Sequence, residues 1–167
     1  MTEERRLLLR ELKDTGRAAV LIRRNVQEAR DVVGPWMPIE AARIAALQRR
    51  ERVEIDAFLF QFLQLAGLLQ DKLTRLILQA SEQDLSRAST RDMRHMLEKL
   101  HALEPGRDFA GIAEIRNRLA QDYPLQSERK AVGINTAFGR SLDLLGGCDD
   151  MLAYVNRTFF GAEAIAS

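Results

Sequence analysis

Residues 55–80 read IDAFLFQFLQLAGLLQDKLTRLILQA, and this stretch decides the fold class. Large apolar residues recur every three or four positions and no proline interrupts them, which predicts one long helix. Its apolar face is wide, as is typical of a helix that lies between neighbours in a core. The stripe consists of Ile55, Phe58, Phe62, Leu65, Leu69, Leu73 and Leu76, broadened by Leu59, Leu63 and Leu68.

The residues before this stretch predict a second long helix and a turn. Within residues 8–33 a single apolar seam recurs at helical spacing, with Thr15 in its one non-aliphatic position. The sequence Gly34-Pro35-Trp36-Met37-Pro38 then ends that helix, because proline disfavours helix interiors and the helical conformation of the preceding residue. The next helical pattern runs from about residue 39 to residue 80, and we expect its arginine-rich early part to project or to be broken.

Shorter helices follow. Ser89 begins a sequence that resembles a capping box, so we expect a helix from there through His101. Asp108 is suited to cap the next helix, which buries Ile112 and Ile115 and ends near Tyr123-Pro124.

Ser127 is suited to cap a further helix, which we expect Gly146-Gly147 to end. The tail, residues 148–167, then adds a turn or two of helix or contacts a partner. The predicted core face of this helix is Ala131, Ile134, Phe138, Leu142 and Leu145. With no strand-like alternation anywhere, the sequence predicts one all-α domain over residues 1–167, an up-and-down bundle of long antiparallel helices.

Composition excludes several classes of protein. The 167 residues carry 25 Lys and Arg against 24 Asp and Glu, and this net charge of +1 argues against a strongly basic nucleic-acid coat. One cysteine and two histidines exclude a disulfide framework and a zinc finger. No signal peptide is visible, and residues 55–69 fall short of the roughly 20 apolar residues of a membrane span. We therefore expect a cytoplasmic protein without a membrane segment.

Three isolated features point to common structural roles. Glu98 and His101 have the spacing of a di-metal helix pair, but the other histidine, His95, lies on the same predicted helix, so we expect no metal or other cofactor. Cys148 precedes two aspartates that raise a thiol pKa, which indicates an unreactive thiol. The arginines at 49–52 are suited to phosphate, but a solvated helix face is the more common arrangement.

The sequence IRNRLAQDYP at residues 115–124 has a different character. Two arginines, two amides and a tyrosine gather at one helix end, where Asn117 and Gln121 lie one turn apart and Arg116 and Tyr123 about two turns apart. From composition alone, a polar face with a tyrosine packed on a neighbour is the more common explanation of these residues. The segment, however, resembles the motif of the HEPN superfamily, specifically the HepT-like toxins of toxin–antitoxin pairs. Arg116-Asn117, Leu119 and Tyr123 match that motif.

The flanks extend this resemblance over residues 90–145. TRDMRHMLEKLHAL resembles the helix before the motif, an aromatic residue (Phe109) precedes the motif helix, and a proline and a capped helix follow it. The resemblance implies a four-helix bundle that acts as a metal-independent endoribonuclease. Arg116 would stabilise the phosphorane, with Asn117 and Arg118 also in contact with RNA. The family's histidine would transfer the proton, but this chain has Gln121 there, and an amide does not exchange a proton near pH 7.

The resemblance also implies partners. Family members form homodimers, and a nucleotidyltransferase (MNT-type) antitoxin modifies the motif tyrosine with AMP, which here is Tyr123. Negative charge on Tyr123 would oppose RNA phosphate beside Arg116. The expected function is thus a HepT-like toxin scaffold that cleaves RNA (mRNA or tRNA) weakly or not at all, whether Gln121 is natural or introduced. The alternative is a helical interaction protein with no nucleic-acid role, an interpretation that Gln121 favours.

Overall fold

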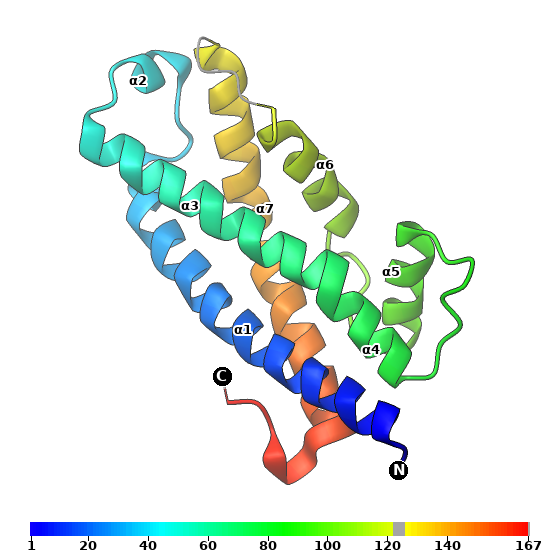
Figure 1. The fold of residues 1–167 in the computed structure, drawn as a ribbon. Helices are drawn as coiled ribbons and strands as arrows, with labels where there is room; N and C mark the ends of the chain where they lie inside the picture. The colour runs from blue at the N-terminus through cyan, green and yellow to red at the C-terminus, as the bar shows by residue number, and fades with distance from the viewer. Residues whose placement is uncertain (122–125, 167) are drawn as a thin grey trace.

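The computed structural model describes residues 1–121 and 126–166, and within them it contains helices, turns and loops but no strand. Three long helical segments form the bundle (Figure 1). They are α1 (Glu3–Val33), the continuous helix made of α3 (Arg49–Gly67), a π-helical stretch η2 (Leu68–Leu73) and α4 (Thr74–Ala80), and α7 (Ser127–Val155). The chain runs along α1 in the direction opposite to α3 and α7 (Figure 1), so the all-α bundle prediction is confirmed.

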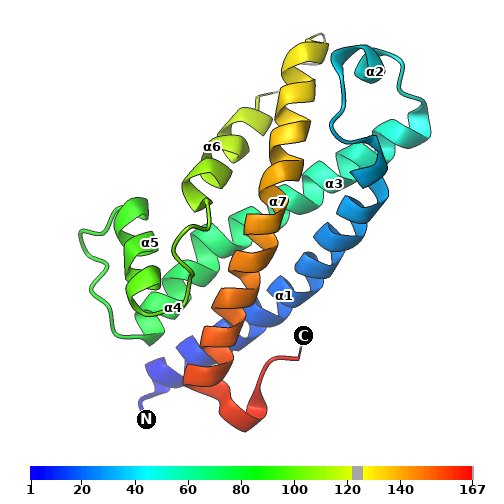
Figure 2. The same cartoon turned by 180° about the vertical axis from the view of Figure 1, so that it is seen from behind.

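Shorter elements join and cover the long helices. A 3₁₀ turn η1 (Gly34–Trp36) ends α1, and α2 (Ala41–Ala45) packs against α7. On the opposite side α5 (Thr90–Lys99) packs on α4, and α6 (Phe109–Leu119) lies beside the first half of α7 (Figure 2). After α7 the chain continues in η3 (Asn156–Phe160) and η4 (Gly161–Glu163), so the prediction of further helix in the tail is confirmed.

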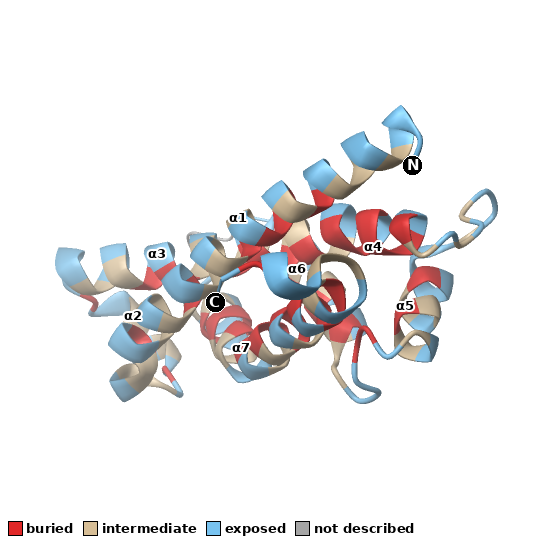
Figure 3. Ribbon diagram, turned by 90° about the horizontal axis from the view of Figure 1, so that it is seen from below, coloured by how far each residue is buried: buried red, intermediate tan, exposed pale blue. Residues whose placement is uncertain are grey.

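The core lies where the long helices meet. Figure 3 shows the buried positions of α1, α4 and α7 turned toward one another. Phe58 and Phe62 of α3 and Leu12 of α1 are fully buried, as are Leu69 and Leu73 of the π-helical stretch. The apolar stripe of residues 55–80 is therefore the centre of the fold, as its width predicts.

This central helix also meets the length and composition of a membrane span. The most apolar 18 residues within Arg49–Ala80 have a mean hydropathy of 1.2, and 33% of them are buried. Contrary to the sequence expectation, length and composition therefore do not exclude a span. Its buried side chains pack against α1 and α7, which is the position of a core helix.

The expected break in residues 39–80 occurs at residues 46–48. Gln48 is the N-cap of α3, where its backbone N–H donates to the Glu51 carboxylate over 3.1 Å. That hydrogen bond lowers the pKa of Glu51, which also forms an ion pair with Arg43. Arg49 and Arg50 are exposed, the arrangement of a solvated helix face.

The predicted caps hold at two helices. Ser89 accepts a hydrogen bond from the backbone of Asp92 over 3.0 Å, and Asp92 accepts one in return from the backbone of Ser89 over 2.9 Å. This reciprocal pair is the capping box expected at the start of α5. The Asp108 carboxylate caps α6, where it accepts from the backbone of Gly111 over 2.8 Å.

Two predictions about α7 are wrong. Gly146-Gly147 does not end the helix, which continues to Val155, and Gln126 rather than Ser127 is the N-cap. Gly147 is needed for packing, because a Cβ there would meet the Phe109 ring, while a Cβ on Gly146 would meet the Arg107 guanidinium at the end of its flexible side chain.

Leu142 is also outside the predicted core face of α7, since its side chain is 59% exposed. The buried face passes instead through Ala137, Ser141 and Leu144. Ser141 is fully buried because its hydroxyl accepts from the Arg30 guanidinium over 2.8 Å and donates to the Phe138 carbonyl over 2.6 Å. A serine with two partners inside the chain thus occupies a position that an apolar pattern would assign to solvent.

Two helices end earlier than predicted. α5 ends at Lys99, and His101 lies beyond it with a positive φ of 58°, so Glu98 and His101 do not share a helix face. α6 ends at Leu119 rather than near Tyr123-Pro124.

The packing of α7 is tested by comparing Gly147, where a Cβ has no room, with Gly139, where a Cβ has open space. We expect Gly147→Ala to lower the free energy of unfolding by about 1–3 kcal/mol, because the added methyl group overpacks the buried Phe109 ring. We expect Gly139→Ala in the same helix to raise it by about 0.5–1 kcal/mol, since a Cβ there meets nothing within 4 Å and alanine favours helix. Urea unfolding followed by circular dichroism measures both. Equal effects of the two substitutions would contradict this packing.

Candidate functional site

The motif region is positioned by the start of α6. Asp108 caps this helix and also forms an ion pair with Arg140 of α7, with 3.1 Å between Oδ2 and Nε. Phe109, Ile112 and Ile115 are buried, which fixes the helix against the bundle. The polar residues between and after them therefore face outward near the C-terminal end of α6.

Three of the predicted site residues line one cleft. Asn117, Arg118 and Gln121 border a space of about 790 Å³ between α6, α3 and the first turns of α7. From α7, Arg129 and Lys130 face the same cleft. The other described residues that line it are Asp56, Leu59, Glu114, Leu119, Glu128, Val132, Gly133 and Ile134.

The fourth, Arg116, borders a neighbouring hollow of about 470 Å³, which Asn117 also lines. Its guanidinium forms a bidentate ion pair with Asp71, with Nη2–Oδ2 at 2.7 Å and Nη1–Oδ1 at 3.2 Å. Nη1 also donates to Oε1 of Gln70 over 3.1 Å. The structure therefore places Arg116 at a hollow beside the cleft and gives its guanidinium an anionic partner.

Both partners of Arg116 come from the π-helical stretch η2. Thr74 donates its hydroxyl proton to the carbonyl of Leu69, five residues earlier, over 2.7 Å. Gln70 lies between two elements, because its Nε2 donates to the Phe109 carbonyl over 2.7 Å while its Oε1 accepts from Arg116. This local widening of the central helix thus meets both the start and the end of α6; π-helical turns occur frequently at functional sites.

The early end of α6 changes the predicted motif geometry. The backbone N–H of Gln121 donates to the Arg118 carbonyl over 3.2 Å in a tightened final turn. Asn117 and Gln121 nevertheless line the same cleft. The predicted alignment of Arg116 with Tyr123 required the helix to continue, and Tyr123 lies outside the described residues.

Charges of both signs line the described part of the cleft. Arg118, Arg129 and Lys130 line it together with Asp56, Glu114 and Glu128, and Arg118 lies 3.8 Å from Glu114. Guanidinium, ammonium and amide groups all suit a phosphate oxygen. The cleft therefore combines donors of the kind that binds anions with carboxylates.

Neither histidine lines the cleft or the hollow. His95 lies in a separate surface depression with Asp84 and Asp92, 3.4 Å from Glu98, and His101 is exposed beyond α5. Across residues 1–121 and 126–166, no group of three or more His, Cys, Asp or Glu side chains is arranged to hold a metal ion. The residues that line the cleft offer hydrogen bonds and charge but no imidazole for proton transfer.

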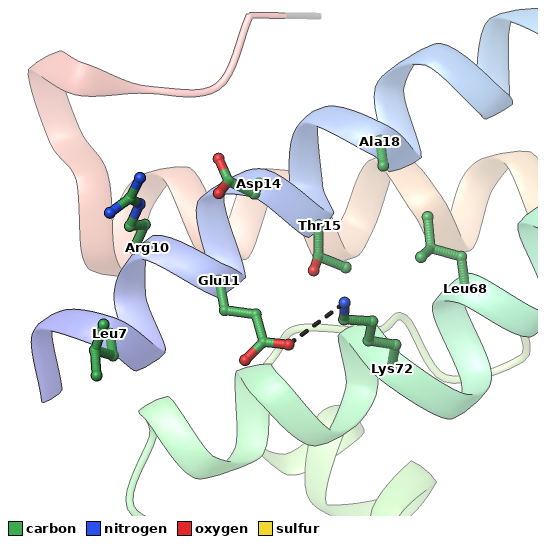
Figure 4. Close-up of a pocket in the computed structure, with 8 residues that line it drawn as sticks. All are labelled: Leu7, Arg10, Glu11, Asp14, Thr15, Ala18, Leu68 and Lys72. Carbon is green, nitrogen blue, oxygen red and sulfur yellow. Dashed lines mark ion pairs between the residues drawn. The ribbon is translucent and has the colours of Figure 1, made fainter. Parts of the chain in front are cut away.

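A second groove lies on the opposite face of the π-helical stretch, against α1 (Figure 4). Glu11 and Lys72 form an ion pair across it, with 3.4 Å between Oε1 and Nζ, and both side chains are about half exposed. Figure 4 shows the other residues that line the groove, which are Leu7, Arg10, Asp14, Thr15, Ala18 and Leu68. We assign the groove a structural role.

Cys148 is buried in the core face of α7. Burial is the main cause that raises the pKa of its thiol to about 12, and the charge of Asp149 acts in the same direction. Arg23, brought near by the fold, opposes this effect without reversing it. The predicted unreactive thiol agrees with this environment.

This environment predicts slow thiol chemistry. At pH 8 the native protein should react with a disulfide reagent such as Ellman's reagent far more slowly than the denatured chain, since a pKa near 12 rather than 9 lowers the thiolate fraction roughly a thousandfold. Absorbance of the released thiolate, with and without guanidinium chloride, measures the difference. Rapid stoichiometric reaction of the native protein would contradict the assigned environment.

Sequence reasoning missed four residues of this region. Arg129 and Lys130 follow the motif by only a few positions, so a basic pair in the first turns of the next helix is a signal that was present. Gln70 and Asp71 interrupt an apolar run in the central helix. That polar interruption was the only sign of a special position, and only the packing of α6 on η2 gives it a partner.

We compared the chain with protein-family models, with curated proteins and with solved structures, and none of them matches it. The interpretation of the site thus depends on its own residues and on the resemblance of residues 90–145.

Proposed function

We propose that the protein is a HepT-like HEPN protein that binds RNA in the cleft at the end of α6. The observation that carries this proposal is the position of Asn117, Arg118 and Gln121, three residues of the motif segment, in one cleft beside Arg129 and Lys130. Arg116 borders the adjoining hollow, and Asn117 lines both spaces. A phosphodiester in the cleft would therefore lie beside Asn117, Arg118 and Gln121, with Arg116 at the adjoining hollow.

The charged residues of the cleft predict a modest RNA affinity with a weak dependence on salt. With the acidic side chains of the cleft nearly balancing the basic ones, affinity comes from a few oriented contacts rather than from a broad positive field. Each neutralised phosphate of single-stranded RNA contributes about −0.7 to the slope of log Kobs against log salt. We therefore expect modest affinity and a shallow slope that corresponds to two or three phosphates.

The proposed catalytic activity is weak or absent because position 121 carries glutamine and not histidine. Attack of a ribose 2′-hydroxyl on the adjacent phosphate needs a group that accepts its proton, and another proton transfer as the 5′-oxygen leaves. Gln121 donates and accepts hydrogen bonds but does not carry that proton. We propose a scaffold of a metal-independent endoribonuclease that binds RNA and cleaves it weakly or not at all.

The proposed partners follow from the same family resemblance. They are a second copy of the chain, RNA, and a nucleotidyltransferase antitoxin that modifies the Tyr123 hydroxyl with AMP in the cytoplasm. The added phosphates would place negative charge at the end of the motif segment that carries Arg116 and Arg118, where they would compete with RNA. This role of Tyr123 needs its hydroxyl and not a histidine at position 121.

A histidine at position 121 tests the scaffold. We expect Gln121→His to cleave total RNA and tRNA in EDTA at least about a hundredfold faster than the unsubstituted protein, the lower range for a positioned general acid or base. Gel electrophoresis of the RNA and detection of 2′,3′-cyclic phosphate ends measure the reaction.

Two further variants are matched controls. Gln79→His places an imidazole on the exposed side of α4, away from the cleft, and should leave the RNA intact. Gln121→His combined with Arg116→Ala should lose the new activity, because no guanidinium then stabilises the phosphorane. Failure of Gln121→His to cleave would remove the nuclease part of the proposal.

The ion pair between Arg116 and Asp71 favours the alternative, a helical interaction protein without a nucleic-acid role, since it gives the phosphate-binding arginine an internal partner. Fluorescence anisotropy with labelled single-stranded RNA separates the two. RNA binding that Arg118→Gln and Lys130→Gln each weaken supports the proposed function. No binding at micromolar protein would support the alternative.

A further inference from the structure

The bidentate contact between Asp71 and Arg116 has the geometry that a phosphate would use. The two carboxylate oxygens of Asp71 accept from the two Nη atoms of Arg116, at 2.7 Å and 3.2 Å. Arginine binds carboxylate and phosphate through the same planar pair of donors, so one anion displaces the other from this face. Asp71 therefore occupies the donors that the proposed function assigns to RNA.

The exposure of the pair allows such an exchange. The Asp71 side chain is 66% exposed and that of Arg116 is 27% exposed, at the rim of the hollow that Asn117 shares with the cleft. Solvent-exposed ion pairs contribute little free energy, because water competes with both partners. Asp71 is thus able to turn into solvent when another anion approaches Arg116.

Gln70 keeps the guanidinium in place during that exchange. Its Nε2 is held by the Phe109 carbonyl at 2.7 Å, so its Oε1 stays directed at Nη1 of Arg116. Gln70 is a neutral partner and does not compete with phosphate for charge. The π-helical stretch thus supplies one residue that positions Arg116 and one that occupies its anion-binding face.

We propose that Asp71 acts as an internal competitor for RNA phosphate and sets the RNA affinity of the site. This inference rests on the proposed function. In the free protein the Asp71 carboxylate masks the guanidinium of Arg116. Only a ligand that makes several contacts in the cleft at once displaces Asp71. A single inorganic phosphate should compete poorly, whereas a stretch of RNA should compete well.

A double-mutant cycle with Asp71→Asn and Arg116→Gln tests this role, with labelled single-stranded RNA in fluorescence anisotropy as the probe. Asp71→Asn should bind RNA about fivefold tighter than the unsubstituted protein, as expected for release of one exposed ion pair. Its salt slope should stay close to that of the unsubstituted protein, since RNA displaces Asp71 and Arg116 neutralises a phosphate in both complexes. The gain in affinity should vanish when Arg116→Gln is present.

A matched control separates masking from a general charge effect. Asp31→Asn removes a negative charge from α1. Asp31 is exposed, and its carboxylate accepts a hydrogen bond from Gln27 of the same helix. It should leave RNA affinity and the salt slope close to those of the unsubstituted protein. Circular dichroism of all variants checks that each is folded.

The outcomes distinguish this inference from the proposed function. If RNA binds and Arg118→Gln weakens it, but Asp71→Asn binds no tighter than Asp31→Asn, the masking role is overturned and the proposed function stands. A gain that persists with Arg116→Gln also overturns it, because the charge of Asp71 would then act without Arg116. If neither the unsubstituted protein nor Asp71→Asn binds RNA, the proposed function fails and this inference with it.

Discussion

Burial of the central helix, Arg49–Ala80, is the constraint on which the rest of the structure depends. Its aromatic and aliphatic side chains cover too wide an arc for a single neighbour, so α1 and α7 must both pack on it. Removal of this apolar surface from water is the dominant favourable contribution to folding of such a bundle. The short helices then occupy what remains: α5 packs on α4, and α6 lies between α3 and α7.

The π-helical stretch is where this core helix also contributes to the candidate site. Leu69 and Leu73 stay in the core, while Gln70 and Asp71 reach α6 and Lys72 reaches Glu11 of α1. The π-helical stretch therefore contributes leucines to the core and polar contacts to both α6 and α1. The position of the Arg116 guanidinium therefore depends on the central helix as well as on α6, the helix that carries it.

In the function that we propose, RNA is recognised by a small number of charged and polar side chains in the cleft. A chain with a net charge of +1 has no general attraction for nucleic acid, so recognition must be local. Among the described residues, three cationic and three acidic side chains line the cleft together with two amides, an arrangement that favours a correctly oriented phosphate over any polyanion. Such a site is sensitive to single substitutions, because each contact is a large part of the whole.

The sequence by itself determined that the chain is helical and which face of the central helix is buried, because helical periodicity and capping are local properties: the stripe of residues 55–80, the cap at Asp108 and the capping box at Ser89 all occur as predicted. Asn117, Arg118 and Gln121 are close together in the sequence itself. Tertiary structure decided the rest. Gly146-Gly147 is usually a helix end, yet here it receives the side chains of Arg107 and Phe109. The Asp71–Arg116 pair joins residues 45 positions apart, and long-range pairing of this kind leaves no periodic signal in the sequence.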